Sequence, residues 1–312
     1  MTGSIGLNAL AVRFRGCGTA LVTPFRDDGS LDEDALRRLV EWQIAAGIDF
    51  LVPCGSTGES AVLSREEHLA VIRITVEAAA GRVPVMAGAG GNNTLRVAEM
   101  ARAVIDEAGA DAVLSVTPYY NRPTQEGLFR HYETVAASVN APIFLYNVPS
   151  RTGVNLLPGT VLRLSEISNI AGVKEASGNI DQISELAVKK SDAFILLSGD
   201  DANTIPILSL GGVGLISVVS NEMPAETSAL VRAGLEGAFG RAMEIQKRIF
   251  PLMRVNFIET SPAPVKAALA SMGRIREVLR LPLVPVQPAS RARITGVLSD
   301  LGLLQTGGKE ST

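Results

Sequence analysis

The chain has 312 residues, of which 46% are hydrophobic and 20% charged, and its net charge is −3. This balance excludes a disordered chain and the basic surface of a nucleic-acid-binding protein. No apolar run approaches the roughly 18 residues of a membrane-spanning helix, and Met1-Thr2-Gly3-Ser4 lacks the basic start of a secretory signal. We therefore expect a cytoplasmic protein that acts on small molecules, not on a membrane or nucleic acid.

Short apolar runs alternate with amphipathic stretches in most of the chain. Eight runs are typical of buried strands: residues 19–23, 50–53, 83–87, 112–116, 143–146, 170–173, 194–197 and 214–218. Helical patterns lie between them, at residues 32–46, 65–80, 95–108, 125–138 and 180–190, several opening on Ser, Thr or Asp caps. A strand-and-helix unit repeated eight times predicts an α/β fold, the (β/α)8 TIM barrel.

A doubly wound sheet is the alternative fold, but Gly88-Ala89-Gly90-Gly91-Asn92-Asn93 has Asn where a dinucleotide fingerprint needs its third glycine. Three helical stretches are expected near the end, around residues 223–255, 262–272 and 289–303. The predicted organisation is an N-terminal extension (1–15), the barrel strands and helices (16–222), the last barrel helix with an appended C-terminal helical region (223–304), and a tail (305–312).

The cysteines and histidines do not indicate a metal site. Cys17 and Cys54 have no metal-ligand spacing and are expected to be buried free thiols. His68 and His131 are too few for a multi-histidine site. Both lie in charge-rich helical stretches, so surface positions are expected.

The carboxyl ends of barrel strands carry the functional residues in such folds, which makes Lys174 the first candidate. It ends an apolar run, in a chain with only six lysines against 23 arginines. A buried amine is favoured in its neutral form, and a neutral amine can attack a carbonyl to form an imine. The alternative is a structural lysine whose stem lies along the sheet while its head reaches water, and the residue alone does not decide between them.

The other strand ends deliver groups that suit carbonyl chemistry. Phenols and hydroxyls can relay protons, backbone N–H groups in a turn before a helix can hold a carboxylate, and an arginine can bind a second carboxylate. These groups are Thr23 after the first strand, Ser56 and Thr57 after the second, Tyr119 and Tyr120 after the fourth, Tyr146 and Arg151 at the fifth, and Ser198-Gly199-Asp200-Asp201 after the seventh.

Each of these features also has a purely structural interpretation. The Gly55-Ser56-Thr57-Gly58 turn can be a capped strand-to-helix connection, and Tyr119 and Tyr120 can be core or interface aromatics. Asp200 and Asp201 most simply cap the next helix, with metal binding the less favoured reading. The agreement between the features favours a catalytic site.

Five segments resemble the 4-hydroxy-tetrahydrodipicolinate synthase (dihydrodipicolinate synthase) family of pyruvate-dependent class I aldolases, which includes N-acetylneuraminate lyase. They are Gly55-Ser56-Thr57-Gly58-Glu59, Pro118-Tyr119-Tyr120-Asn121-Arg122-Pro123, Tyr146-Asn147-Val148-Pro149-Ser150-Arg151-Thr152-Gly153, Val173-Lys174-Glu175-Ala176 and Ser198-Gly199-Asp200-Asp201. The resemblance runs from about Arg15 to Leu304. It implies condensation of pyruvate with aspartate 4-semialdehyde in lysine and diaminopimelate biosynthesis, by a homotetramer (a dimer of dimers) without cofactor or metal.

The resemblance also implies a role for each site residue. Lys174 would form the Schiff base with pyruvate, and Tyr146 would be the main proton donor and acceptor. Ser56 and Tyr120 would complete a proton relay, with Tyr120 supplied by the neighbouring subunit. Thr57 would bind the pyruvate carboxylate and Arg151 that of the semialdehyde, while Gly199 and Ile216 would line the pocket through their backbones.

The chain departs from the family pattern in several places. Many members have Thr at Ser56, where the hydroxyl survives and activity is expected to be retained, and often Asn at Ser261. Lysine-inhibited members often have His and Glu at the positions of Arg65 and Arg96, although the regulatory-cleft residues Ser60, Ala61, His68, Asn92 and Tyr119 fit. Two guanidinium groups repel a cationic ligand, so weak or absent lysine inhibition is expected.

Three other functions compete with this one. A sister pyruvate aldolase or lyase acting on a sialic acid, a keto-deoxy sugar acid or a hydroxy-oxoglutarate would share Lys174 and Tyr146, but Arg151 suits a short carboxylated aldehyde better. A non-catalytic sensor would not need the lysine, tyrosine and hydroxyl set. A metal-dependent class II aldolase would use Asp200 and Asp201 and lose activity with a chelator.

Overall fold

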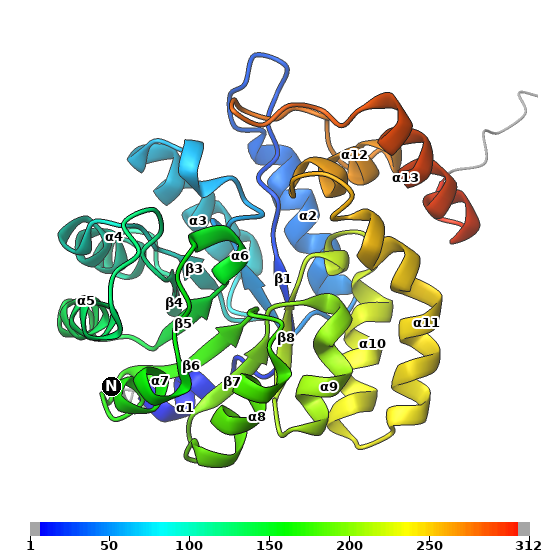
Figure 1. Ribbon diagram of the computed structural model, residues 1–312. Coiled ribbons are helices and arrows are strands. Elements are labelled where there is room, and N and C mark those ends of the chain that lie inside the picture. Colours follow the sequence, from blue (N-terminus) through cyan, green and yellow to red (C-terminus); the bar gives the residue numbers. More distant parts are fainter. Residues whose placement is uncertain (1–6, 305–312) are drawn as a thin grey trace, which may run out of the picture.

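The computed structural model describes residues 7–304, so the expected tail and the first six residues of the expected extension lie outside the described part. Eight parallel strands form one sheet in the order β2-β1-β8-β7-β6-β5-β4-β3 (Figure 1). A parallel bridge between Leu51 and Val85 joins the two end strands, and the N–H of Leu51 donates to the carbonyl of Pro84 at 3.0 Å. The predicted (β/α)8 barrel is confirmed.

Six strands follow the predicted runs to within two residues at each end, whereas the first and the third begin three residues away from them. The eight strands are β1 (Gly16–Ala20), β2 (Phe50–Val52), β3 (Met86–Gly88), β4 (Ala112–Val116), β5 (Ile143–Asn147), β6 (Ile170–Glu175), β7 (Ile195–Ser198) and β8 (Gly214–Ser217). Strand β1 begins three residues before the predicted run because Gly16 and Gly18, which have low strand propensity, belong to it. Gly18 is required there, since a Cβ at this position would lie 2.0 Å from the Phe50 ring.

The predicted barrel helices are present, and most start at the cap residue that the sequence supplies. They are α2 (Glu33–Ala45), α3 (Arg65–Ala79), α4 (Thr94–Asp106), α5 (Gln125–Ala137) and α8 (Ile180–Lys189), capped by the side chains of Asp32, Ser64, Asn93, Thr124 and Asn179. Several short elements were not predicted from the sequence. They are the helices α1 (Leu7–Val12), α6 (Pro149–Thr152), α7 (Pro158–Leu164) and α9 (Thr204–Ser209), and the 3-10 turns η1 (Ser60–Val62), η2 (Asp201–Asn203) and η3 (Val219–Asn221).

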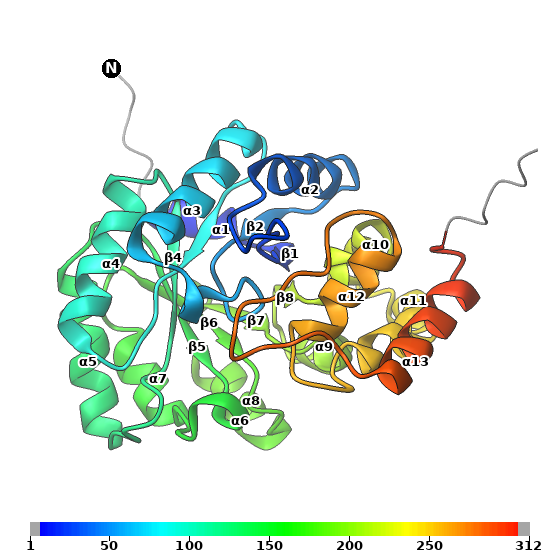
Figure 2. The ribbon, with the colours of Figure 1, turned by 90° about the horizontal axis from the view of Figure 1, so that it is seen from above.

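The end of the chain forms four helices where three stretches were expected. The stretch 223–255 is divided into α10 (Pro224–Leu235) and α11 (Phe239–Val255), with Gly237 between them at φ +75°. Helix α12 (Ala263–Ser271) and helix α13 (Pro288–Asp300) follow. Helix α12 packs against α13, and Figure 2 shows α12 closer to the barrel, with α13 farther out. The domain boundary at residue 223 stays a prediction.

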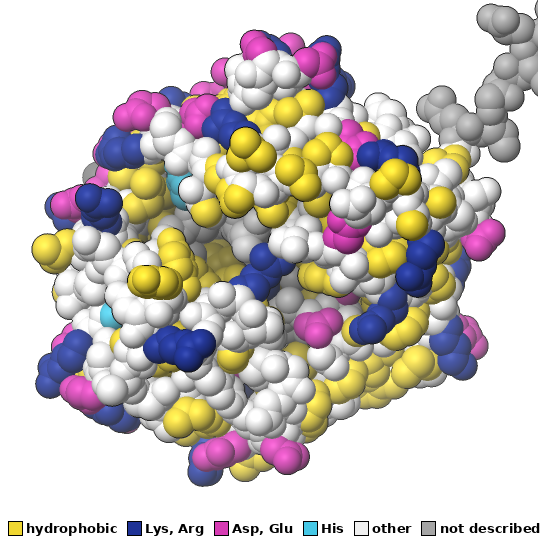
Figure 3. Space-filling model, turned by 45° about the horizontal axis from the view of Figure 1, so that its top comes forward, with side chains coloured by type: hydrophobic (Ala, Val, Ile, Leu, Met, Phe, Trp, Pro, Cys, Tyr) yellow, Lys and Arg dark blue, Asp and Glu magenta, His cyan; other side chains and the backbone are white. Residues whose placement is uncertain are grey.

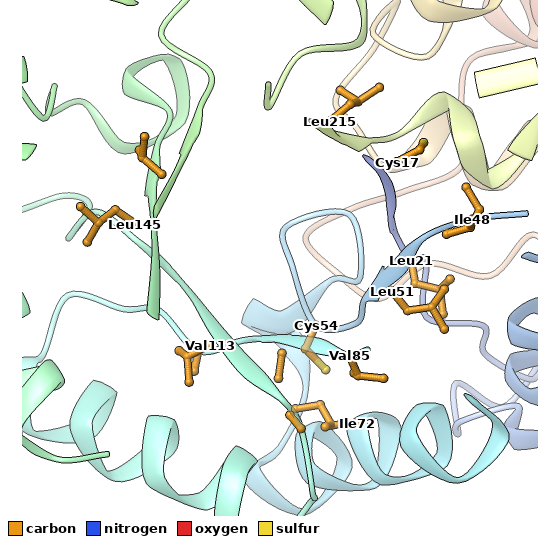
Figure 4. Packing of buried hydrophobic residues seen from close by; sticks show 14 of the residues in the cluster. Cys17, Leu21, Ile48, Leu51, Cys54, Ile72, Val85, Val113, Leu145 and Leu215 are labelled. Carbon is orange, nitrogen blue, oxygen red and sulfur yellow. The ribbon is translucent and has the colours of Figure 1, made fainter. Parts of the chain in front are cut away.

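Successive residues of each strand face alternately the barrel interior and the surrounding helices. In β5, Ile143 and Leu145 pack in the outer layer, whereas Phe144 and Tyr146 belong to the interior cluster. Figure 4 shows part of the outer layer, where Leu51 and Val85 lie near Ile72 of α3. The interior is filled from below by Phe14, whose ring contacts those of Phe50 and Phe144 edge-on at centroid distances of 5.6 and 5.4 Å.

The thiols are buried as expected, but the prediction of surface histidines was wrong. Cys17, Cys54, His68 and His131 are all buried. His68 Nε2 lies 2.7 Å from the carbonyl of Gly88, and His131 Nδ1 lies 3.0 Å from the hydroxyl of Thr94. Their helices turn these side chains toward the barrel, and burial lowers the pKa of both, that of His131 to about 4. Among residues 7–304, no helix is both long and apolar enough to span a bilayer.

Candidate active site

Lys174 and Tyr146 face each other inside the barrel near its mouth. The two residues are direct register partners of the parallel pair β5–β6. Because Val173 packs in the outer layer, the next residue, Lys174, projects into the interior, where it is only 5% exposed. Its Nζ lies 4.2 Å from the centroid of the Tyr146 ring. The amine predicted from sequence is therefore buried beside the predicted phenol.

Gly199 provides the space for the Lys174 side chain. A Cβ at Gly199 would lie 2.9 Å from Cγ and 3.0 Å from Cε of Lys174, and 2.9 Å from Cβ of Ala176. These distances are below those of ordinary carbon contacts. Ile216, on the adjacent strand β8, is buried in the interior cluster together with Tyr146. Both residues thus lie close to the Lys174 and Tyr146 pair, while their predicted part in lining the pocket stays a prediction.

The loop after β2 carries Ser56 and Thr57 in a tight series of turns. Its two ends, Cys54 and Glu59, have left-handed φ angles of 56° and 53°. The N–H groups of Gly58 and Glu59 donate to the carbonyls of Gly55 and Ser56. Thr57 is buried and Ser56 is half-buried. Within the described residues, no hydrogen bond joins Ser56 to Tyr146 or Tyr120.

Arg151 lies in α6, the single helical turn that follows β5. Its Nη2 donates to the carbonyl of Ser261 at 3.3 Å, across 110 positions of sequence. Thr152 in the same turn accepts from the hydroxyl of Thr117. The exposed guanidinium is thus held at the barrel mouth by the segment just before α12.

Tyr120 is placed differently from the other predicted site residues. Its side chain is 90% exposed and its backbone has a left-handed φ of 73°, whereas Tyr119 is 40% exposed. The tyrosine therefore projects away from the Lys174 and Tyr146 pair of its own chain.

A cavity of about 650 Å³ opens at the barrel mouth, and Figure 3 shows this face hollowed near its centre. The predicted residues Ser56, Tyr119, Tyr146 and Arg151 line it, together with Ser261. The predicted residues Lys174, Thr57, Gly199, Ile216 and Tyr120 are not in its lining. The cavity therefore reaches Tyr146, whose ring centroid lies 4.2 Å from the Lys174 amine.

Comparison with known proteins identifies the family. The sequence model of the Dihydrodipicolinate synthetase family matches residues 13–301. This chain belongs to that family. The 4-hydroxy-tetrahydrodipicolinate synthase of Koribacter versatilis is 52% identical over 294 residues, which cover 94% of this chain and 98% of that one. The resemblance expected from the five segments is confirmed.

Solved structures of the dihydrodipicolinate synthetase family share the whole fold. The dihydrodipicolinate synthase of Aquifex aeolicus has a TM-score of 0.91 at 44% identity and covers 94% of this chain and 100% of its own. A structure described as a monomeric dihydrodipicolinate synthase variant has a TM-score of 0.92 at 41% identity and covers 94% of this chain and 99% of its own.

The residues expected at a regulatory cleft line the same cavity as the active-site candidates. The set comprises Ser60, Ala61, Arg65, His68, Asn92, Arg96 and Tyr119. Arg65 forms an ion pair with Glu107, at 2.6 Å between Nη2 and Oε1. Arg96 is exposed at the start of α4.

The carboxylates of Asp200 and Asp201 have structural partners. Asp200 caps η2 by accepting from the N–H of Ala202 at 2.9 Å. Asp201 is buried, where it accepts from the hydroxyl of Ser217 and the N–H groups of Val218 and Val219. In the described residues, no group of three or more His, Cys, Asp or Glu side chains could hold a metal ion. The capping expected for Asp200 is confirmed. The same expectation was wrong for Asp201, because its carboxylate binds the N–H groups that follow β8 and not those of the next helix.

A buried carboxylate lies directly behind the site and was not predicted from the sequence. Glu175 follows Lys174 and faces the opposite side of β6, where it accepts from the amide of Asn147 at 3.1 Å and the N–H of Ser177 at 2.7 Å. Burial raises the pKa of Glu175, while these hydrogen bonds oppose the shift. Asn147 and Glu175 are the register pair that follows Tyr146 and Lys174. The sequence signal that could have predicted this carboxylate is the position of Glu175, a charged residue at the end of a buried strand.

Proposed function

We propose that this chain is a class I lyase that condenses pyruvate with L-aspartate 4-semialdehyde to give 4-hydroxy-tetrahydrodipicolinate, a step of lysine and diaminopimelate biosynthesis in the cytoplasm. One observation carries the proposal: in a member of the dihydrodipicolinate synthetase family, the Lys174 amine lies inside the barrel, 4.2 Å from the centroid of the Tyr146 ring. The name of the Koribacter versatilis relative supports the choice of reaction.

Lys174 is the proposed nucleophile. Its neutral amine attacks the keto carbon of pyruvate, and the resulting carbinolamine loses water to form an imine. The imine withdraws electrons from the adjacent methyl carbon, which loses a proton to give an enamine. That carbon then forms a bond to the aldehyde carbon of the semialdehyde, whose oxygen takes up a proton. Hydrolysis or internal displacement by the substrate amine releases Lys174.

Each of these steps moves a proton, which is the role proposed for Tyr146. Tyr146 lines the cavity and its ring lies 4.2 Å from the Lys174 amine, so its phenol is proposed to exchange protons with a substrate bound to the lysine. Ser56, in the same lining, is the proposed next member of the relay. Its hydroxyl does the same chemistry as the threonine of many relatives.

The loops at the barrel mouth are proposed to provide two binding sites for substrate carboxylates. The buried turn at Thr57 is proposed to hold the pyruvate carboxylate, and Arg151 that of the semialdehyde, since a guanidinium binds a carboxylate through two parallel hydrogen bonds. Gly199 and Ile216 are proposed to bound the pocket through their backbones beside Lys174. No cofactor or metal enters this proposal.

Tyr120 is proposed to complete the relay in the neighbouring subunit of a homotetramer built as a dimer of dimers. Its 90% exposed side chain points out of its own chain and is available to a second copy. A relative is described as a monomeric variant, so assembly needs its own measurement. Sedimentation of the wild-type protein is expected to show a tetramer. An activity assay of Tyr120→Ala is expected to show a loss of turnover.

The decisive experiment combines trapping and turnover. Pyruvate with borohydride is expected to leave a reduced adduct on Lys174, located by peptide mass spectrometry, and Lys174→Ala is expected to leave none. Addition of aspartate semialdehyde is expected to give condensation. An adduct without condensation would favour a sister aldolase, and chelator-sensitive activity without an adduct would favour the class II mechanism.

A further inference from the structure

Lys266 is a fully buried lysine that the proposed reaction does not use. It lies in α12, 0% exposed, with its ammonium 4.3 Å from the centroid of the Phe25 ring. Nζ donates to the carbonyl of Thr23 at 2.9 Å and to Oε1 of Glu59 at 2.6 Å. Burial lowers the pKa of Lys266, and the carboxylate of Glu59 opposes that shift. A buried charge of this kind persists only where its partners are fixed.

Both partners of Lys266 belong to loops at the barrel mouth. Thr23 is in the loop after β1, and its hydroxyl donates to the carbonyl of Gly58 at 2.7 Å. Glu59 ends the turn that carries Ser56 and Thr57, and its side chain is 0% exposed. One ammonium therefore connects two loops, and both connections reach the turn proposed to bind the pyruvate carboxylate.

The carboxylate of Glu59 has a second partner from the C-terminal region. Oε2 of Glu59 accepts from the backbone N–H of Arg280 at 3.2 Å. The guanidinium of Arg280 in turn binds Glu67 at the start of α3 through two hydrogen bonds of 2.6 Å. Lys266 and Arg280 thus both hold this turn from outside the barrel.

We propose that Lys266 is a positioning residue, whose ammonium fixes the turn 55–59 in the conformation that receives the pyruvate carboxylate. The inference rests on the proposed function, because it concerns the same turn. It assigns α12 a part in substrate binding, although α12 contributes no group that touches the substrate. The left-handed φ of Glu59, at 53°, is a conformation that a non-glycine residue keeps only when its surroundings hold it.

The test removes both charges together. Lys266→Met alone leaves the Glu59 carboxylate buried without its ion-pair partner, which threatens folding. The double variant Glu59→Gln/Lys266→Met keeps both side-chain shapes and leaves no buried charge. The matched control is Glu277→Gln/Arg291→Met, which removes a bidentate ion pair of 2.5 and 2.6 Å within the same C-terminal region and touches neither loop.

The double variant is expected to raise the KM for pyruvate roughly 10- to 100-fold, the range set by a displacement of about 1 Å. Borohydride trapping at low pyruvate should fall in parallel and recover at saturating pyruvate, while the KM for the semialdehyde stays near that of the wild type. The control should keep both KM values. If the double variant does not fold, Glu59→Gln/Lys266→Gln carries the test, because it also leaves no buried charge, with a smaller increase in the same direction.

A folded variant whose pyruvate KM is unchanged would overturn the inference and leave the proposed function intact. An equal rise of both KM values in the variant and in the control would also overturn it, because that pattern indicates general loosening. A wild-type protein that forms no adduct with pyruvate overturns the proposed function, and the positioning role falls with it.

Discussion

Gly199→Ala tests whether the position of the Lys174 amine limits catalysis. The added methyl group would lie 2.9 Å from Cγ and 3.0 Å from Cε of the lysine, where carbon atoms normally keep about 3.5–4.0 Å. The lysine stem must therefore move by roughly 0.5 to 1 Å. A rotamer change alone cannot relieve the clash, because the same methyl lies 2.9 Å from Cβ of Ala176, which is fixed to the backbone.

Two effects of different size follow from this displacement. A shift near 1 Å in a reacting group costs about 100-fold in rate, so kcat is expected to fall by roughly that factor. Overpacking of a buried site costs about 1–3 kcal/mol, which for a chain of this length lowers Tm by a few degrees. Catalysis should therefore suffer far more than folding.

Turnover with pyruvate and aspartate semialdehyde, the rate of borohydride-trapped adduct formation and thermal unfolding are the three measurements. Gly159→Ala in α7 is the control, since a Cβ there meets no atom within 4 Å, and it should leave kcat unchanged. Wild-type kcat in Gly199→Ala, with the added methyl accommodated, would refute the reasoning. A loss of turnover with normal adduct formation would place the defect after the imine.

Three further predictions concern the same molecule. Tyr146→Phe should slow turnover about 100- to 10,000-fold by removing a proton shuttle, with its fold intact by circular dichroism, and near-normal turnover would contradict the role. Lysine should inhibit weakly or not at all, because Arg65 and Arg96 line the cavity expected to receive its cation; strong, saturable inhibition at submillimolar lysine would refute this. Burial lowers the pKa of His131 to about 4, so its contribution to stability is complete above about 6.5 and is lost as the pH falls toward 4. As the pH falls, the unfolded chain takes up a proton on His131 before the folded chain does. The free energy of unfolding, measured by urea titration at several pH values, should therefore depend less steeply on pH in His131→Gln than in the wild type. Equal dependence on pH in the two proteins would contradict the prediction.

The barrel could be predicted from sequence because its signals are local. Each buried strand is a short apolar run, and each following helix begins at a side chain such as Ser64 or Thr124 that caps it. The errors arose where tertiary contacts override local preference. Strand β1 includes Gly18 because the Phe50 ring occupies the space of a side chain, and His131 is buried although charged residues surround it in sequence.

Lys174 could also be selected as a candidate from sequence, since a lysine that ends an apolar run is recognised without knowledge of distant residues. The contacts that hold the loops of the site in place could not be predicted from the sequence. Lys266 and Glu59 are 207 positions apart, and Arg151 meets the Ser261 carbonyl across 110 positions. Nothing local in either segment indicates the other, so these contacts emerge only when the chain is folded.

The candidate Lys174, which could be selected from sequence, lies in the barrel interior, whereas the contacts that support the site lie at the barrel mouth. Below Lys174 the interior is closed by Phe14, Phe50 and Phe144, and Gly172 leaves room for the last of these rings, since a Cβ there would lie 2.9 Å from it. This apolar floor closes the interior beneath the Lys174 side chain. The mouth above must instead present hydroxyl, amide and guanidinium groups on loops, and loops need external support to hold one conformation. Ser261, Lys266 and Arg280 of the C-terminal region supply that support, so the segment that follows the barrel strands reaches back to the mouth of the barrel.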